Sequence, residues 1–230
     1  MKNLFILLFL FAQTELNGQS GNGTYNERIL QAFQLDVNLR ASLNTIYDYS
    51  NINGSPFMQE KYSLGNVQTS KDFFKNVSMK YNIVDDVFLF EINGKELYLD
   101  PTKYVKRVFL DGYNYVIRQL PNSKKESDFV IELDSSKISI FCKRVKIYKP
   151  AEAAKAIIAT PKPASFVNKP NKYYIQLGSG PLIFLEKLKD IYQLFPDEAE
   201  ALKKYIKAED LDFKKEIDLI KIVQFCSSKV

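Results

Sequence analysis

Alternating hydrophobic and polar residues run through the middle of the chain. Val77, Met79 and Tyr81 alternate with polar residues, which is the period-two pattern of a strand buried on one face. Runs bounded by turn residues predict further strands over 87–92, 96–99, 104–110, 113–118, 128–133 and 137–148. Because turn residues separate these segments at short intervals, the pattern favours an antiparallel meander over βαβ units. We expect about six to eight strands between residues 65 and 148.

Two dipeptides within this region are typical of hairpin turns. Asn93–Gly94 and Asp111–Gly112 consist of residues that tolerate positive φ, as the type I′ turn of a two-residue hairpin requires. Each dipeptide separates two predicted strands. These turns support consecutive antiparallel pairing.

Apolar residues recur at helical spacing towards both ends of the chain. One or two short helices are predicted between residues 26 and 49, and further helices over 181–195, 197–208 and 213–227. The expected fold is therefore α+β. It comprises an N-terminal helical segment, an antiparallel β-meander and two or three C-terminal helices that pack with the sheet as one unit.

Residues 149–172 are rich in Pro, Ala and Lys. Residues 151–159 could form a short helix, and the remainder is expected to be an extended connection, because proline cannot pair in a central strand. Residues 173–177 are predicted to form one more strand. The expected segments are 1–19 (signal peptide), 20–64 (leader and N-terminal helical segment), 65–148 (meander), 149–172 (connection) and 173–230 (strand and C-terminal helices).

The first residues have the pattern of a secretory signal peptide. Lys2 precedes an unbroken apolar run over residues 4–12, and polar residues follow at once. This run is shorter than the roughly 20 residues that cross a bilayer, and a charge followed by a short apolar run and a polar exit is typical of export signals. We expect a periplasmic, outer-envelope-associated or extracellular protein whose mature chain has no transmembrane span. The alternative is a buried N-terminal strand or helix.

Composition excludes several kinds of chemistry. The 230 residues include no histidine and two cysteines, so Ser-His-Asp catalysis, histidine-ligated zinc and Cys₄ zinc sites are excluded. The motifs Gly-x-Ser-x-Gly and Ser-x-x-Lys are absent as well. We expect no cofactor and no metal, and the sequence identifies no catalytic residue.

Paired carboxylates offer no obvious catalytic site either. They occur at Asp85–Asp86, at Asp197–Glu198 and within 209–212. Adjacent acids on a strand point to opposite faces, so we interpret these residues as members of turns and helix caps.

Positive charge is concentrated between residues 143 and 172. This segment contains eight basic residues and one acid, within a chain of net charge +5. Lys143, Arg144 and Lys146 are candidate ligands for an anionic glycan or lipid surface, and such binding would weaken with salt. The alternative is a solvated, lysine-decorated strand. Nucleic acid is not an expected partner of an exported chain.

A glycine-rich turn, Gly178–Ser179–Gly180, is a second candidate for anion binding. It lies between a predicted strand and a predicted helix, where free backbone amides can hold an anion. The third glycine of a dinucleotide fingerprint and the lysine of a P-loop are both missing. The alternative is a tight turn with Pro181 in the first helical turn.

The two cysteines are the remaining candidates for chemistry. Cys142 lies in a predicted strand and Cys226 on the apolar side of the last predicted helix. In an oxidising compartment a disulfide between them would clamp that helix to the sheet and stabilise the fold by roughly 2–5 kcal/mol. The alternative is two buried thiols that act as small apolar residues.

The layout resembles an uncharacterised group of exported, β-rich envelope proteins of Gram-negative bacteria. The resemblance depends on the segments 53–57, 65–67 and 79–86, the dipeptide Asn93–Gly94, and the lysine-rich segments 205–207 and 214–216. It implies export and a β-rich body, and it carries no activity or site.

These observations favour a non-catalytic envelope or secreted module that binds a protein, glycan or lipid. One alternative is an envelope hydrolase that uses carboxylates or a Ser–Lys pair. The other is a carrier of an apolar ligand. Two carboxyl groups converging in a cleft would favour the hydrolase, and an apolar cavity between sheet and helices would favour the carrier.

Overall fold

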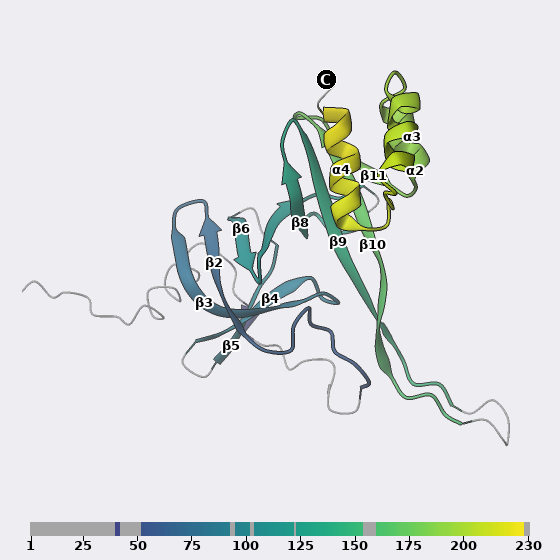
Figure 1. Cartoon of the computed structure of the whole chain (residues 1–230). Helices are drawn as coiled ribbons and strands as arrows, with labels where there is room; N and C mark the ends of the chain where they lie inside the picture. The colour runs from purple at the N-terminus through teal and green to yellow at the C-terminus, as the bar shows by residue number, and fades with distance from the viewer. Residues whose placement is uncertain are drawn as a thin grey trace, which may run out of the picture.

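A single antiparallel sheet with three C-terminal helices makes up the described part of the protein (Figure 1). The computed structural model describes residues 40–41, 52–92, 95–101, 104–121, 123–153 and 160–227. Within these ranges the strands are β1 (Arg40–Ala41), β2 (Ser63–Thr69), β3 (Phe73–Asn82), β4 (Val87–Ile92), β5 (Lys95–Leu99), β6 (Val105–Leu110), β7 (Tyr113–Arg118), β8 (Asp128–Ser135), β9 (Ile138–Lys149), β10 (Ser165–Leu177) and β11 (Leu182–Leu185). The helices are α2 (Leu188–Leu194), α3 (Ala199–Ala208) and α4 (Glu216–Ser227).

The strand order confirms the meander. It runs β1-β5-β4-β3-β2-β6-β7-β8-β9-β10-β11, so every pair except β2–β6 and β1–β5 joins consecutive strands. Asp111 and Gly112 turn β6 into β7 with φ of 51° and 79°, as the predicted type I′ hairpin requires. The sheet described here has eleven strands rather than six to eight, because β1, β10 and β11 extend it at both ends.

The core lies in the curled part of the sheet and continues beneath the helices. Tyr81, Phe88, Tyr115 and Phe129 are almost fully buried and form one aromatic cluster. The same core reaches Ile191, Leu202, Leu219, Ile222, Val223 and Cys226 on the three helices. Helix α4 contacts β8 and β9, and α2 contacts β11. Sheet and helices therefore share one core, as expected of a single unit.

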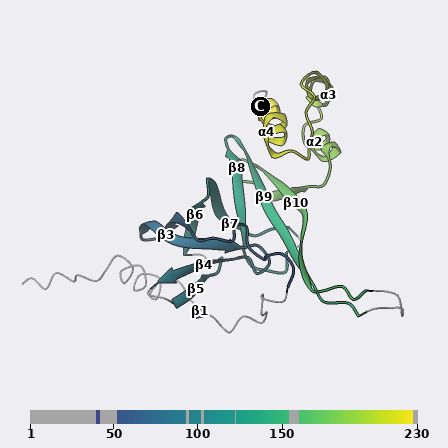
Figure 2. The same cartoon turned by 60° about the horizontal axis from the view of Figure 1, so that its bottom comes forward.

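Part of the region 149–172 is strand rather than connection, because Lys149 ends β9 and residues 165–172 belong to β10. β9 and β10 form a long ribbon that extends beyond the other strands (Figures 1 and 2). Pro170 lies inside β10, at a register shift between Lys169 and Lys172. A bulge interrupts the ladder, so the missing amide of proline breaks no regular pair. Of the helix suggested for 151–159, residues 154–159 lie outside the described residues, and Glu152 forms a β-bridge with Lys162.

The C-terminal helices agree with the prediction apart from where the first one starts. Residues 182–185 form β11 instead of the first turn of a helix, and α2 begins at Leu188. This short segment is entirely apolar, and periodicity cannot distinguish a strand from a helix in such a run. The Asp190 carboxylate then accepts hydrogen bonds from the backbone amides of Glu186 and Lys187, which satisfies two donors at the start of α2.

The N-terminal predictions fall mostly outside the described residues. The dipeptide Asn93–Gly94, further along the chain, also lies outside them. The same holds for the signal peptide over 1–19 and for the helices over 26–49 apart from Arg40 and Ala41. Those two residues form β1, which pairs with Tyr98 and Leu97 of β5, so the helical prediction is wrong at this point. None of the helices in the described ranges has the length and apolar character to cross a membrane.

Candidate functional site

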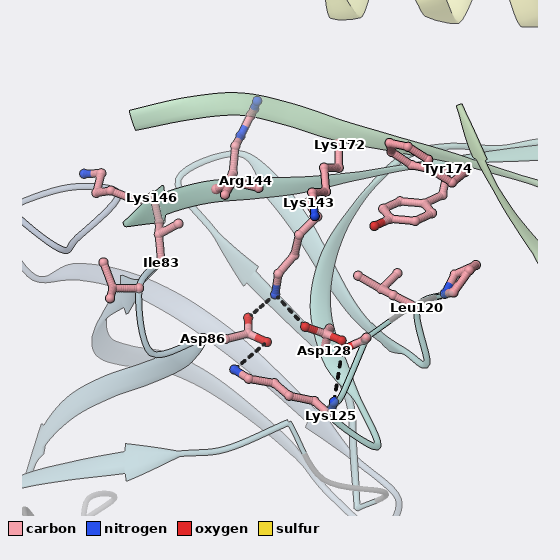
Figure 3. Close-up of a pocket in the computed structure, with 15 residues that line it drawn as sticks. Ile83, Asp86, Leu120, Lys125, Asp128, Lys143, Arg144, Lys146, Lys172 and Tyr174 are labelled. Atoms are coloured by element: carbon pink, nitrogen blue, oxygen red, sulfur yellow. Dashed lines mark hydrogen bonds and ion pairs between the residues drawn. The ribbon is translucent and has the colours of Figure 1, made fainter. Parts of the chain in front are cut away.

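A cavity of about 290 Å³ contains the most unusual group of charges in the described chain (Figure 3). Lys143 of β9 points into it and lies between two carboxylates. Its Nζ atom is 2.5 Å from Oδ1 of Asp86 and 3.3 Å from Oδ1 of Asp128. The same ammonium group donates a hydrogen bond to the carbonyl oxygen of Phe129, at 3.0 Å.

The turn between β3 and β4 places Asp86 in this cavity. The Asn82 side chain accepts hydrogen bonds from the backbone amides of Val84 and Asp85 and donates one to the Asp85 carboxylate. The chain then turns back at Asp86, whose φ is 63°, a conformation that Asp and Asn tolerate better than most residues. Asp85 therefore has the expected turn role. Asp86 ends the same turn, but its buried side chain has partners beyond the turn.

Each oxygen of the Asp86 carboxylate has a defined partner. The Tyr81 hydroxyl donates to Oδ1 at 2.5 Å, and the Phe129 backbone amide donates to Oδ2 at 3.3 Å. Lys125 approaches Oδ2 at 3.8 Å from the exposed side. Burial, and secondly the neighbouring Asp86, raise the pKa of Tyr81 well above its ordinary value, so this phenol remains a proton donor.

Asp128 is less completely satisfied. Its residue is 5% exposed, and its Oδ2 atom is buried without a hydrogen-bond partner among the described residues. Burying a charged group is unfavourable unless it is paired and hydrogen-bonded. Two carboxylates and one buried ammonium group therefore form a compact charged cluster (hereafter the Asp–Lys–Asp cluster: Asp86, Lys143 and Asp128) that has one unused acceptor.

Arg144 and Lys146 do not extend this cluster into an exposed basic stripe. Arg144 points to the opposite side of β9 (Figure 3) and pairs through both terminal nitrogens with Glu216, the first residue of α4. Lys146 donates to the carbonyl oxygens of Ser55 and Phe57, at 2.8 and 2.7 Å. The three basic residues singled out from the sequence thus occupy three separate internal contacts. Alternation of side chains along the strand separates Lys143 from Arg144, and Lys146, two residues beyond Arg144, reaches a different partner in the segment before β2.

The glycine-rich turn is not the start of a helix. Gly178, Ser179 and Gly180 connect β10 to β11 in a hairpin, with a backbone hydrogen bond from Gly180 to Leu177 and a side-chain bond from Gln176 to the Gly180 carbonyl. Without a helix N-terminus at Pro181, the aligned amides that could hold an anion are missing. The helix on which the anion-site interpretation depended is therefore not present at this position.

Cys142 and Cys226 are both buried and both free. Cys142 Sγ lies 3.4 Å from a carboxylate oxygen of Glu216, at the beginning of α4. Cys226 lies ten residues further along the same helix, which corresponds to about 15 Å of helix axis. Cys142 therefore lies beside the beginning of α4, while Cys226 belongs to its last turn. This separation favours the alternative of buried apolar thiols over the disulfide.

A larger groove, of about 850 Å³, lies at the end of β11 beside α2 and the segment that precedes α4. Its walls are mainly apolar: Val145, Pro170, Tyr173, Phe184, Leu185, Leu188 and Phe213. Its charged residues are Lys169, Lys172, Lys187, Lys214, Glu186 and Asp212. Among the described residues, none of the four lysines has an ion-pair partner. We call this feature the lysine-rimmed groove.

A buried thiol and a buried phenol make the free energy of unfolding fall as the pH rises above 9. Burial, and then Glu198, raise the pKa of Cys226 from 9.0 to about 11, and burial raises the pKa of Tyr174 from 10.0 to about 12. Both groups hold their proton more tightly in the folded chain, so this stabilisation is present below pH 9 and is lost as the pH rises to about 12. Urea unfolding at neutral pH and at steps above pH 9 should show the decline.

The double variant Cys226→Ala, Tyr174→Phe should have a shallower decline, because two of the responsible groups are gone. An unchanged slope in that variant would contradict the assignment.

Sequence reasoning identified Lys143 but missed both of its carboxylate partners. Asp86 appeared as a turn residue, and Asp128 as the first residue of a strand. No local pattern joins positions so far apart, because their proximity depends on the register of β8 and β9 and on the β3–β4 turn. The groove could not be predicted from the sequence either, since its walls come from four separate segments.

A search for metal-binding groups and comparisons with known proteins complete the description of the chain. Within the described ranges, no group of three or more His, Cys, Asp or Glu side chains is arranged to hold a metal ion. Comparison of the chain with protein-family models, with curated proteins and with solved structures gave no match.

Proposed function

We propose that this protein is an exported, non-catalytic binding module whose ligand is an amphiphile with an apolar chain and an anionic group. The observation that carries this proposal is the lysine-rimmed groove, with apolar walls and four lysines that have no ion-pair partner within the described ranges. Export follows from the signal-peptide pattern at residues 1–19. The expected location is the periplasm, the outer envelope or the medium.

The walls of the groove suit the apolar part of such a ligand. Tyr173 and Leu185 are buried at its base, while Phe213 and Leu188 are half-buried and Phe184 is 38% exposed. Ligand sites of this kind usually occupy 300–1,000 Å³ and are lined mainly by apolar side chains with a few polar groups. Filling the groove would remove these side chains from water, which is favourable by roughly 25 cal/mol per Å².

The rim of the groove suits the anionic part. Lys169 and Lys172 come from β10, and Lys187 and Lys214 come from the segments before α2 and α4. Two acids, Glu186 and Asp212, leave the rim with an excess of positive charge. The first two lysines belong to the basic segment recognised in the sequence. A carboxylate or phosphate at the rim would meet these cations while its chain lies against the apolar walls.

The pairing of two carboxylates with Lys143 distinguishes this function from the hydrolase alternative. Asp86 and Asp128 do converge, as a carboxylate hydrolase would need, but Lys143 pairs with both. Neither carboxylate is available to a substrate as a free base. An apolar site beside both sheet and helices is the feature expected of a carrier.

Titration of the purified protein with a fluorescent long-chain fatty acid tests this function. Neutralising two rim lysines, in Lys172→Gln/Lys214→Gln, should weaken binding about threefold or more and should reduce its dependence on salt. The matched control Lys61→Gln/Lys106→Gln removes two exposed lysines outside the groove and should leave the affinity unchanged.

Two further ligands separate the contributions of chain and charge. The corresponding long-chain alcohol should bind more weakly than the acid, and a two-carbon carboxylate should not bind measurably. Equal loss of affinity in the rim variant and the control, or no binding of the long-chain acid, would overturn the proposed function.

A further inference from the structure

We infer that Lys143 and Asp86 become joined through their side chains by an amide bond, with Asp128 acting as the proton carrier. This intramolecular cross-link concerns the Asp–Lys–Asp cluster and is independent of ligand binding in the lysine-rimmed groove. It would tie the β3–β4 turn covalently to β9. Three features of the cluster support it: contact between the reacting groups, polarisation of one carboxyl group, and exclusion of water.

The reacting groups are already in contact. Lys143 Nζ lies 2.5 Å from Oδ1 of Asp86 (Figure 3), so the carboxyl carbon is only one covalent bond further away. The Lys143 side chain is 11% exposed and that of Asp86 is 3% exposed. Holding two reactants at contact distance in a fixed orientation removes much of the entropic barrier to their reaction. The carbonyl oxygen of Phe129 also fixes the position of Nζ.

Asp86 is the carboxyl group prepared for attack. The Tyr81 hydroxyl and the Phe129 amide each donate a hydrogen bond to one of its oxygens. When an amine adds to the carboxyl carbon, negative charge develops on oxygen, and donors already directed at that oxygen stabilise it. Asp128 has no comparable pair of donors, because its Oδ2 atom lacks a partner among the described residues.

That unused oxygen makes Asp128 the proton carrier. Its other oxygen lies 3.3 Å from Lys143 Nζ, so the carboxylate is placed to accept a proton from the ammonium group. The amine that this transfer creates has the lone pair needed for attack. A carboxyl group in this position can then return the proton to the departing oxygen, as a general acid.

The aromatic cluster shields one side of the reacting groups from bulk water. Tyr81 and Phe129 belong to the buried aromatic cluster, and both contact Phe88, with ring centroids 4.8 and 4.9 Å apart. Exclusion of water strengthens the electrostatic contacts and limits hydrolysis of the product. The cavity on the other side, next to the exposed Lys125, gives the released water molecule a way out.

The reaction balances without any other reactant. The ammonium group of Lys143 and the carboxylate of Asp86 become one neutral amide and one water molecule. Nζ loses two of its three protons, one before and one after a C–N bond forms at the Asp86 carboxyl carbon. Asp128 passes both protons in turn to the same oxygen of Asp86, which leaves as water when its C–O bond breaks. Asp128 begins and ends as a carboxylate.

Mass spectrometry of the purified, denatured protein tests the cross-link. The expected result is a mass lower than that of the processed chain by one water molecule, with a proteolytic peptide pair joined through Lys143 and Asp86. Unmodified mass in folded protein would overturn the inference. Loss of water within a single peptide, as in a cyclic imide, would overturn it too, and a bond from Lys143 to Asp128 would refute the assignment of roles.

Variants test the roles of the individual groups. Asp86→Ala should abolish the joined peptide, and Asp128→Asn, which keeps the side-chain shape, should slow its formation by about a hundredfold or more. The control Lys124→Met removes an exposed cation that does not line the cavity and should leave cross-linking intact. Circular dichroism identifies variants that fail to fold; the wild-type peptide map decides the question even if Asp86→Ala is one of them. Equal cross-linking in Asp128→Asn and wild type would refute proton transfer by Asp128.

Discussion

Replacing Phe88 with alanine should lower the free energy of unfolding by about 3–5 kcal/mol. Phe88 is completely buried, and its ring lies 4.8 Å from Tyr81, 5.0 Å from Tyr115 and 4.9 Å from Phe129 between centroids. The truncation would remove three aromatic contacts and leave a cavity that a closely packed sheet cannot close. Urea unfolding followed by circular dichroism measures the change.

Two matched variants give this prediction its control. Phe88→Leu keeps most of the apolar volume and should lose less stability than the alanine variant. Phe73→Ala removes a ring that is 49% exposed, so its effect should be small, within about 0.5 kcal/mol. Similar losses for Phe88→Ala and Phe73→Ala would show that the aromatic cluster is not the centre of the core.

Replacing Glu216 with alanine should destabilise the protein by about 3–5 kcal/mol. The Glu216 carboxylate accepts hydrogen bonds from both terminal nitrogens of Arg144, from Asn171 at 3.2 Å and from Tyr173 at 3.4 Å. It therefore holds the first turn of α4 against β9 and β10. Its removal would leave the Arg144 guanidinium, with a side chain only 13% exposed, without its counter-charge.

A double-mutant cycle separates the ion pair from the unpaired charge. Arg144→Met/Glu216→Leu removes both charges and places apolar side chains beside each other, so it should be more stable than Glu216→Ala alone. A double variant that is as unstable as the two single losses combined would show that the pair does not act as a unit. Chemical unfolding of the double variant and of the single variants Arg144→Met, Glu216→Leu and Glu216→Ala at one pH provides the comparison.

Much of the sheet could be predicted from the sequence, because its strands and turns are specified locally. Alternating apolar and polar residues, together with the turn residues between segments, predicted β3, β4, β6 and β7. The dipeptide Asp111–Gly112 predicted one hairpin. Two errors have local causes. Pro170 indicated an extended connection where β10 instead continues past an irregular pairing. The apolar run 182–185 matched strand and helix patterns equally well.

The candidate sites were much harder to predict, because they are made by pairing between distant segments. Lys143 was identified by its charge, but whether a lysine on a strand faces solvent or a buried carboxylate depends on the register of the sheet. Asp86 had the local features of a turn residue, and those features do not report where its side chain points. Arg144 illustrates the same limit, since its partner Glu216 lies in the last helix.

The short strand β11 has a consequence for the behaviour of the protein at high concentration. It ends the sheet on one side, contains four residues, and leads directly into α2. An open strand edge is a template on which a foreign chain can add by backbone pairing. Here β11 pairs with only four residues of β10 and offers an incoming chain few amide contacts, so the addition of a foreign chain to β11 itself is disfavoured.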